Sequence, residues 1–530
     1  MIRSSFVTSL LCVCALSPLT LTTASAQRRG ATEGATPTAA AEAHPTPIPP
    51  EAASATDHEI TVDGKPLRYT ATAGTLLIDG ADEQPNCSVF YVAYTQHAID
   101  VRTRPVTFLY NGGPGSATMW LHMGSVGPMR VVTSSPAATG SGPYELVPNQ
   151  FTLLDRTDLV FVDAPGTGYS RPVGKGTTRD FAGTDQDAQA FAKFIERYIS
   201  VNHRWNSPKF IFGESYGTTR SAVLADVLEN AGVSLNGVIL MSSILNYYSH
   251  APGSDAEFIG YLPSYAAIAW HFEKISHKGK DQKAFLNEVR AFARGPYAEA
   301  LAMGDQLPAA QLDSIAAKLS SYTGLSVQYL KEANLRVSAT RFRKELLRDQ
   351  RMILGRYDAR FEATDTDAAG ENPGYDPSST GITGAFTACL HDYLERELKY
   401  STKLTYFPSG PGLNQEWDHS HRLGGNVGGG GGGRGGFAAM REAYVVGDLA
   451  DAIRKNPKLK VFSANGLFDL ATPFFITEYD LAHMELEPKL RGNVQFGYYP
   501  SGHMIYLNVD ALKQFKSDIS GFYTQAVGGE

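Results

Sequence analysis

The chain has 530 residues, of which 43% are hydrophobic, and its formal net charge is −7. A chain of this length is too long to fold around one simple hydrophobic core. It therefore predicts either two domains or one large domain that carries an insertion. The charges are spread along the chain without basic runs, which excludes the pattern of a nucleic-acid-binding or anionic-membrane-binding protein.

The amino-terminal 56 residues predict a signal peptide followed by a linker. Arg3 supplies a positive charge, residues 6–21 are mostly apolar, and residues 24–26 (Ala-Ser-Ala) have the spacing of a cleavage site. A membrane anchor needs about 18 or more apolar residues, and no segment offers them. Residues 27–56 are rich in Ala, Pro and Thr, which predicts a disordered linker. We therefore expect an exported protein, periplasmic or secreted, that has no membrane anchor.

Residues 57–245 read as the first part of an α/β core. Residues 60–62 and 67–72, joined by Asp63-Gly64, predict a tight hairpin, and residues 76–78 and 89–94 continue an antiparallel edge. From residue 106 onward, short apolar runs alternate with helical patterns, as in a mostly parallel sheet covered on both faces. One helix is predicted beyond Thr184, which is a candidate N-cap. The predicted buried strands cover residues 106–110, 159–162, 210–212, 238–241, 459–462 and 494–498.

Residues 246–440 interrupt this rhythm and predict a helical insertion that caps the carboxyl ends of the strands. Residues 283–294 and 312–319 have helical periodicity, and the glycine-rich tract 424–436 reads as a loop. His419 and His421 are interpreted as part of a polar loop, and we expect neither a metal nor a cofactor. Residues 441–530 form the second part of the core. The sequence leaves open whether Cys87 and Cys389 form one disulfide or remain two free thiols.

The strongest catalytic motif is Gly-Glu-Ser-Tyr-Gly at residues 213–217. It follows an apolar run and precedes a helical pattern, which is the context of a nucleophile elbow centred on Ser215. A serine nucleophile needs a base and a group that orients this base. His503 and Asp469 each follow a predicted strand, so both are expected at the same edge of the sheet as Ser215. The chain order Ser, Asp, His is that of α/β-hydrolases.

A tetrahedral oxyanion needs backbone N–H donors near the nucleophile. One is expected from Tyr216, the residue after the serine. The second is expected from the glycine-rich turn at residues 111–115 (Asn-Gly-Gly-Pro-Gly), which follows an earlier strand.

Four segments together resemble the serine carboxypeptidase family: residues 111–115, 162–170 (Val-Asp-Ala-Pro-Gly-Thr-Gly-Tyr-Ser), 213–217 and 502–504 (Gly-His-Met). The resemblance covers roughly residues 100–250 and 455–515. It implies an α/β-hydrolase fold with a helical insertion and peptide substrates. The resemblance also implies a triad of Ser215, Asp469 and His503, oxyanion donors at Gly113 and Tyr216, and binding of the substrate's C-terminal carboxylate by Asn111, Gly112 and Glu214.

The sequence departs from the family pattern at three positions. A Trp that usually stands two residues before the Asn is Leu109, and a Cys that often follows the glycine turn is Ser116. A second Glu usually stands two residues before a Gly-Pro pair, and here this position holds Ser125. We expect Ser125 to donate a neutral hydrogen bond to the substrate carboxylate instead.

These residues leave more than one function open. The leading hypothesis is a serine carboxypeptidase that acts through an acyl-enzyme. The alternative is an esterase or acyltransferase on the same fold and triad, which the weakened carboxylate site favours. A prolyl aminopeptidase fits residues 111 and 213–217 less well, and the intact triad argues against a catalytically silent binding protein. The sequence predicts neither the preferred residues nor the oligomeric state.

Overall fold

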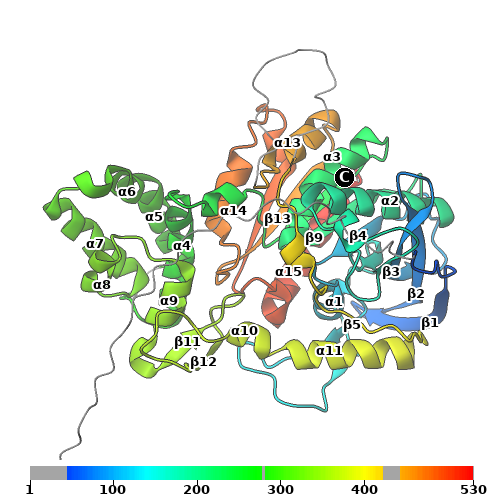
Figure 1. Ribbon diagram of the computed structural model, residues 1–530, viewed down its shortest axis with the longest axis horizontal. Helices are drawn as coiled ribbons and strands as arrows, with labels where there is room; N and C mark the ends of the chain where they lie inside the picture. Colours follow the sequence, from blue (N-terminus) through cyan, green and yellow to red (C-terminus); the bar gives the residue numbers. More distant parts are fainter. Residues whose placement is uncertain (1–44, 277–280, 422–441, 529–530) are drawn as a thin grey trace, which may run out of the picture. The chain divides into compact units, whose positions relative to one another are not determined.

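The computed structural model describes residues 45–276, 281–421 and 442–528. Its centre is a ten-stranded mixed sheet in the order β1-β2-β3-β7-β4-β9-β10-β13-β14, with β8 paired to β3 (Figure 1). The strands of this sheet are β1 (Ala53–Val62), β2 (Lys65–Asp79), β3 (Pro85–Gln96), β4 (Val106–Tyr110), β7 (Asp158–Val162), β8 (Arg171–Pro172), β9 (Lys209–Glu214), β10 (Gly237–Met241), β13 (Lys460–Gly466) and β14 (Val494–Tyr499).

From β7 to β14 neighbouring strands run parallel, as predicted. All six predicted strands are present, and five of them are buried because their continuous apolar runs suit a sheet with helices on both faces. The predicted burial of 494–498 is wrong, since β14 is an edge strand on which Phe496 is exposed. Parallel strands place their carboxyl ends at one edge. The loops after β4, β9, β13 and β14 therefore start side by side.

The antiparallel part begins with the predicted hairpin. Val62 pairs with Lys65 across Asp63 and Gly64, whose φ angles of 49° and 77° are those of a type I′ turn. The predicted linker 27–56 is wrong at its carboxyl end, because β1 starts at Ala53 and Thr46 already bridges to Gly174. Pairing with β2 and with residue 174 orders a segment whose own composition is too apolar-poor to fold. The predicted signal peptide and residues 27–44 lie outside the described residues.

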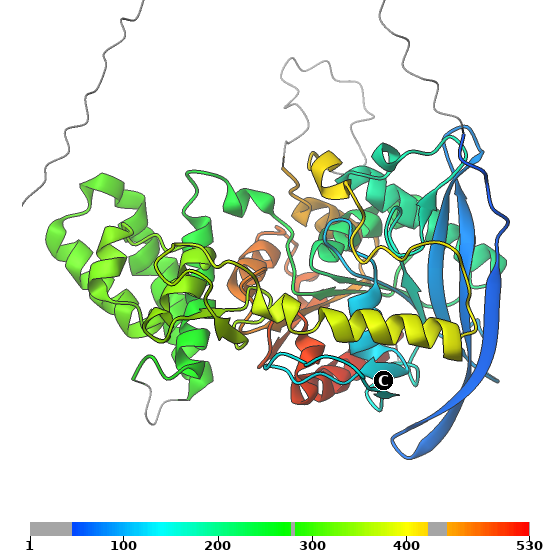
Figure 2. The ribbon, with the colours of Figure 1, turned by 60° about the horizontal axis from the view of Figure 1, so that its bottom comes forward.

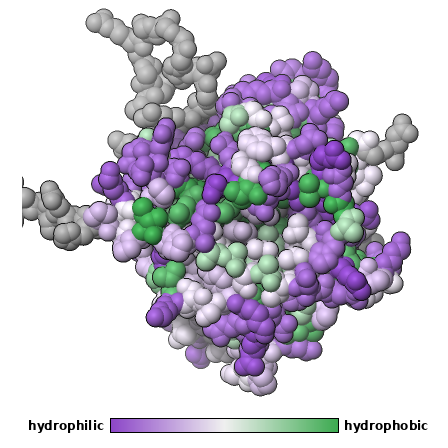
Figure 3. Space-filling view, turned by 90° about the vertical axis from the view of Figure 1, so that its right-hand side faces the viewer, coloured by the Kyte–Doolittle hydropathy of each residue, from purple (hydrophilic) through white to green (hydrophobic). Residues whose placement is uncertain are grey.

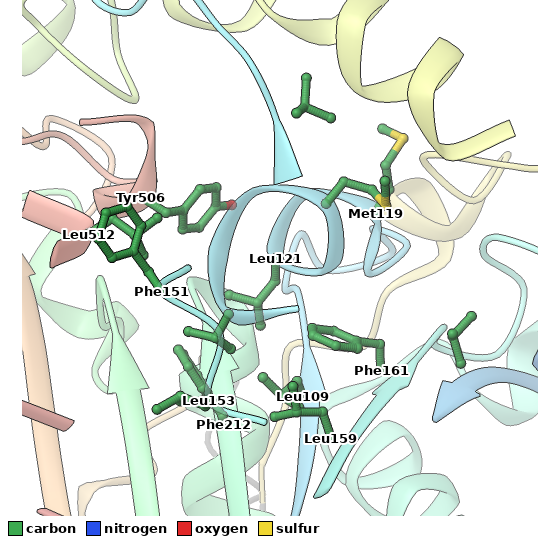
Figure 4. Packing of buried hydrophobic residues seen from close by; sticks show 14 of the residues in the cluster. Leu109, Met119, Leu121, Phe151, Leu153, Leu159, Phe161, Phe212, Tyr506 and Leu512 are labelled. Carbon is green, nitrogen blue, oxygen red and sulfur yellow. The ribbon is translucent and has the colours of Figure 1, made fainter. Parts of the chain in front are cut away.

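Two layers of helices cover the sheet. On one face α2 (Thr184–Val201), α3 (Tyr216–Asn230) and α13 (Val446–Lys455) pack on alternate strand residues such as Phe108 and Ile211. On the other face lie α1 (Met119–Leu121), α11 (Thr383–Asp392) and α15 (Val509–Ala526). There Leu121 points toward Leu109, Phe161 and Phe212 of the strands (Figure 4). Successive side chains of a buried strand point to opposite faces of the sheet, and they therefore contribute to two separate hydrophobic cores.

The structure corrects the predicted N-cap of α2 and decides the state of the two cysteines. Thr184 is not the N-cap of α2, since Gly183 holds that position and the Thr184 N–H donates to the Asp418 carbonyl. Pairing of Gly183 with Asp418 moves the start of the helix by one residue. Cys87 and Cys389 are both free and buried, and they belong to the cores on opposite faces of the sheet.

The insertion has two parts. The predicted helices at 283–294 and 312–319 are α5 (Gln282–Phe292) and α7 (Ala309–Thr323). With α4 (Ala256–His271), α6 (Ala298–Met303), α8 (Val327–Glu332) and α9 (Ala339–Glu345), they build a separate core, which also includes α14 (Phe474–Ala482). The chain then returns through β11 (Met352–Leu354), β12 (Glu362–Thr364) and α10 (Pro377–Thr380) to α11 on the body (Figure 2).

Several smaller elements complete the described chain. They are β5 (Met129–Val131), β6 (Leu146–Pro148) and α12 (Leu413–Glu416). No helix of the described ranges is long and apolar enough to span a bilayer. The face on the side of β1 and β2 is mainly hydrophilic with a band of hydrophobic side chains (Figure 3).

His421 ends the second described range and is buried between two carboxylates, Asp185 of α2 at 2.6 Å and Asp448 of α13 at 2.8 Å. Burial lowers the pKa of His421, but both carboxylates raise it more, to about 9. His421 is therefore positively charged at neutral pH, and its ion pairs with the two carboxylates hold this part of the chain against α2 and α13. The glycine-rich tract lies outside the described residues.

Candidate active site

Ser215 lies between the end of β9 and the start of α3, at φ 61° and ψ −132°. This strained conformation is the signature of a nucleophile elbow. Its N–H donates to the Met241 carbonyl oxygen at 3.0 Å, which holds the turn on strand β10. A Cβ atom on Gly213 would lie 2.1 Å from the Gly217 carbonyl oxygen, so only glycine permits a turn this sharp.

Asp469 and His503 follow β13 and β14 and meet at the same sheet edge. Asp469 Oδ2 lies 2.7 Å from His503 Nδ1, and both side chains are buried. The same carboxylate accepts the N–H groups of Ala471 and Thr472 and the Thr472 hydroxyl. Burial lowers the pKa of His503, but the charge and hydrogen bond of Asp469 raise it more, so the net shift is upward.

Ser215 and His503 line one cavity of about 290 Å³. The structure contains no hydrogen bond between Ser215 Oγ and the His503 ring, which is common in enzymes without substrate. The two side chains nevertheless face a shared space. The sequence-predicted residues Asn111, Gly112, Gly113 and Glu214 also line this cavity.

The glycine turn after β4 packs directly on the elbow. A Cβ atom on Gly112 would lie 2.4 Å from the Tyr216 nitrogen, and Gly113 has a φ of +110°. Tyr216 is the first residue of α3, so its N–H has no partner within the helix. The glycine turn and the start of α3 therefore lie against each other beside Ser215.

Glu214 is a buried carboxyl with one unpaired oxygen. Asn111 donates to Glu214 Oε1 at 2.9 Å, while the buried Glu214 Oε2 has no hydrogen-bond partner among the described residues. Burial raises the pKa of Glu214 to about 7; the His503 charge and the neighbouring Tyr506 and Asn111 oppose this rise. The group therefore carries a proton near neutral pH and can donate it to an anion in the cavity.

Ser125 does not reach the cavity, which corrects its expected role in carboxylate binding. It is fully buried in the π-helical segment His122–Val126, and its hydroxyl donates to the Leu121 carbonyl four residues earlier. A serine inside a helix commonly bonds back to the preceding turn in this way. Its own carbonyl accepts from Asn149, so the backbone there is also occupied.

The segment 162–170 supports the glycine turn. Asp163 is buried, and its Oδ1 accepts the Thr118 N–H at 2.8 Å, just beyond the turn. Burial raises the pKa of Asp163 to about 6, against hydrogen bonds from Thr118, Tyr169 and Tyr406 that lower it. Of the departing positions, Leu109 lies in the core of the sheet and Ser116 lines the cavity.

The remaining walls of the cavity were missed by sequence reasoning. They come from helix α1, from the loop after β14 and from the insertion, which carries no motif. The N–H of His503 donates to the Tyr357 carbonyl at 2.6 Å, and the two rings lie 5.3 Å apart. The other lining residues are Trp120, Ser379, Ile382, Thr383, Pro408, Ser409 and Met504.

Comparison with known proteins relates part of this chain to a peptidase family. Residues 65–271 match a family model described as serine carboxypeptidase. The pheromone-processing carboxypeptidase KEX1 of Cryptococcus gattii is 28% identical over 193 residues, or 34% of this chain and 27% of that protein. Serine carboxypeptidase-like 51 of Arabidopsis thaliana is 27% identical over 193 residues, or 35% of this chain and 37% of that protein.

The chain thus spans only about a third of the length of these curated relatives. A crystal structure of Kex1, a prohormone-processing carboxypeptidase from Saccharomyces cerevisiae, aligns with a TM-score of 0.50 at 15% identity. It covers 86% of this chain and 91% of the Kex1 chain, and at this identity it supports the α/β-hydrolase fold alone. Residues 65–271 are therefore similar to the serine carboxypeptidase family, and the described chain has the α/β-hydrolase fold.

Proposed function

We propose that this chain is a serine carboxypeptidase that removes C-terminal residues from peptides through an acyl-enzyme. The observation that carries this proposal is the shared cavity, in which the strained Ser215 faces His503 and a buried carboxyl, Glu214. Asp469 holds the histidine from behind. A nucleophile, a base, an orienting acid and an anion-binding group thus converge on one space.

Acylation begins when Ser215 Oγ attacks the carbonyl carbon of the last peptide bond. The hydroxyl proton passes to His503 Nε2, and the carbonyl oxygen becomes an oxyanion that accepts the N–H groups of Gly113 and Tyr216. When this intermediate collapses, the C–N bond breaks and His503 gives its proton to the leaving amine. Asp469 stabilises the transient imidazolium because its carboxylate accepts the Nδ1–H.

Deacylation repeats these steps with water. His503 takes a proton from a water molecule, whose oxygen attacks the acyl carbon. The second oxyanion uses the same two donors, and its collapse breaks the bond to Ser215 Oγ, which recovers the proton from His503. The products are a peptide shortened by one residue and a free amino acid.

Recognition of the C-terminal carboxylate falls to Asn111, Gly112 and Glu214. Two carboxylates in contact cannot both stay ionised, so Glu214 must keep a proton to bind the substrate. Its raised pKa, about 7, supplies this proton in neutral solution. Because the Ser125 hydroxyl does not face the cavity, Glu214 is the one acid that binds the substrate carboxylate in this proposal.

The pH dependence of KM follows from Glu214. Above pH 7 the KM for a free-acid peptide should rise about tenfold per pH unit, because binding then requires a proton that has left. The KM for the same peptide amidated at its C-terminus should stay flat. Glu214→Gln should remove the rise and improve cleavage of free-acid peptides at alkaline pH. Steady-state kinetics on the peptide pair measure both, and equal cleavage of the pair at every pH would favour the esterase or acyltransferase reading.

Thr472 offers a smaller test of the triad. Its hydroxyl donates to Asp469 Oδ2 at 2.7 Å and lies 3.1 Å from His503 Nδ1. Thr472→Val should lower kcat by about tenfold, since it removes one hydrogen bond to a charged group. Thr472→Ser keeps the hydroxyl and is the matched control. Equal kcat in the valine and serine variants would contradict a role for this hydroxyl.

An esterase or acyltransferase remains the second candidate, favoured by the burial of Ser125 away from the cavity. Two measurements separate the candidates. A fluorophosphonate probe should label wild type and spare Ser215→Ala. Mass spectrometry of a peptide library should show loss of single C-terminal residues. Labelling without any peptide shortening would replace the carboxypeptidase by the second candidate.

We also propose that residues 1–26 direct export and are removed. The expected mature chain starts after Ala26. Amino-terminal sequencing of the exported protein tests this expectation, and retention of Arg3 in that protein would contradict it.

A further inference from the structure

A short segment of the insertion is hydrogen-bonded to both loops that carry Asp469 and His503. The Arg356 carbonyl accepts the Leu470 N–H at 3.0 Å, and the Tyr357 carbonyl accepts the His503 N–H at 2.6 Å. The Arg356 N–H in turn donates to Asp376 Oδ1 at 3.0 Å, at the start of α10. The backbone at Arg356 is therefore held in place relative to the triad.

The Arg356 side chain is exposed and stands against the wall of the cavity. Its guanidinium carbon lies 5.3 Å from the centre of the Tyr357 ring. The Tyr357 ring lines the cavity and lies 5.3 Å from the His503 ring. Tyr357 therefore contacts both the cation and the histidine at the side of the cavity built by the insertion.

Arg356 has no acidic partner within the described residues. The other arginines of the insertion in these ranges, apart from Arg351, are paired with carboxylates: Arg290, Arg294, Arg336, Arg341, Arg343, Arg348, Arg360 and Arg396. The field of Arg356 reaches His503, where it lowers the pKa of the histidine. An unpaired cation of this kind attracts anionic ligands toward the cavity.

We propose that Arg356 selects peptides that carry an acidic side chain next to the scissile bond. The inference rests on the proposed carboxypeptidase function and names its substrate class. In the proposed function the C-terminal carboxylate is received by Asn111 and Glu214 at the ends of β4 and β9, whereas Arg356 lies beside Tyr357, a residue of the insertion that lines the cavity. A Glu or Asp side chain of the bound peptide completes the pair that Arg356 lacks, through the bidentate geometry that guanidinium and carboxylate favour.

The experiment compares peptides that differ only by Glu or Gln at one of the two residues flanking the scissile bond. Wild type should cleave the Glu peptide about tenfold faster in kcat/KM, and Arg356→Gln should bring this ratio to about one. Arg356→Glu should instead favour a third peptide that carries Lys at the same position. Arg351→Gln removes from the same insertion another exposed charge that has no acidic partner in the described ranges, and it should leave the ratio unchanged.

A second readout is the pH profile of kcat/KM on a neutral peptide. His503 is faced by three charged groups, Asp469, Glu214 and Arg356, of which only Arg356 lowers its pKa. A general base must be neutral to act, so Arg356→Gln should move the acidic limb to higher pH. Arg351→Gln should not move it.

These experiments distinguish a failure of the inference on Arg356 from a failure of the proposed carboxypeptidase function. If wild type shortens no peptide, the carboxypeptidase proposal fails. If wild type shortens peptides but the Glu-to-Gln ratio is the same in Arg356→Gln, the inference on Arg356 is overturned. It is also overturned if this variant changes only the ratio between free-acid and amidated peptides, since Arg356 would then read the C-terminal carboxylate.

Discussion

Replacement of Ser215 by alanine is expected to reduce kcat for peptide hydrolysis by roughly 10⁴- to 10⁶-fold. In the proposed mechanism the Ser215 hydroxyl oxygen forms the bond to the acyl group, and alanine has no atom that can form it. Alanine keeps the backbone at φ 61° as accessible as serine does, so the fold should be unchanged. Single-turnover kinetics with a chromogenic peptide measure the loss, and circular dichroism verifies the fold.

Ser116→Ala is the matched control, because Ser116 lines the same cavity but follows the glycine turn. It should retain kcat within a few-fold. His503→Ala should cost as much as Ser215→Ala, and the double variant should lose little more, since the triad acts as a unit. Near-full hydrolysis by Ser215→Ala would remove the serine mechanism for this chain.

Asp469→Asn is expected to reduce kcat by about 10⁴-fold. The Asp469 carboxylate accepts hydrogen bonds from two N–H groups and the Thr472 hydroxyl, and pairs with His503 Nδ1. An amide cannot accept at both ends, so His503 loses either its orientation or its correct tautomer. Stopped-flow or steady-state assays over a pH range measure the loss.

The pH profile of Asp469→Asn provides an independent check. The charge of Asp469 raises the pKa of His503, so its removal should shift the acidic limb of the residual activity to lower pH. Asp480→Asn is the control, since Asp480 is also buried but bonds to Asn246. An unchanged kcat in Asp469→Asn would exclude Asp469 as the residue that orients His503.

Two of the predictions made from the sequence, those on residues 53–56 and on Ser125, were wrong. Residues 53–56 have the composition of a linker, yet they form part of β1 because β2 supplies their hydrogen bonds. Ser125 occupies the position of an acid and was expected in the cavity, but the π-helical segment turns its hydroxyl onto Leu121. Both outcomes depend on partners that local composition does not encode.

Local patterns by themselves determined the buried strands, the elbow at Ser215 and the loops that carry Asp469 and His503. They did so because continuous apolar runs specify parallel strands, and the carboxyl ends of such strands share one edge. Only the tertiary structure decided what surrounds this edge. Tyr357 and Arg356 lie more than a hundred residues from the loops that carry Asp469 and His503. The Tyr357 carbonyl accepts the His503 N–H, and the Arg356 carbonyl accepts the Leu470 N–H. Contacts of this kind leave no periodicity or motif in the chain, so the substrate-facing wall becomes visible only after folding.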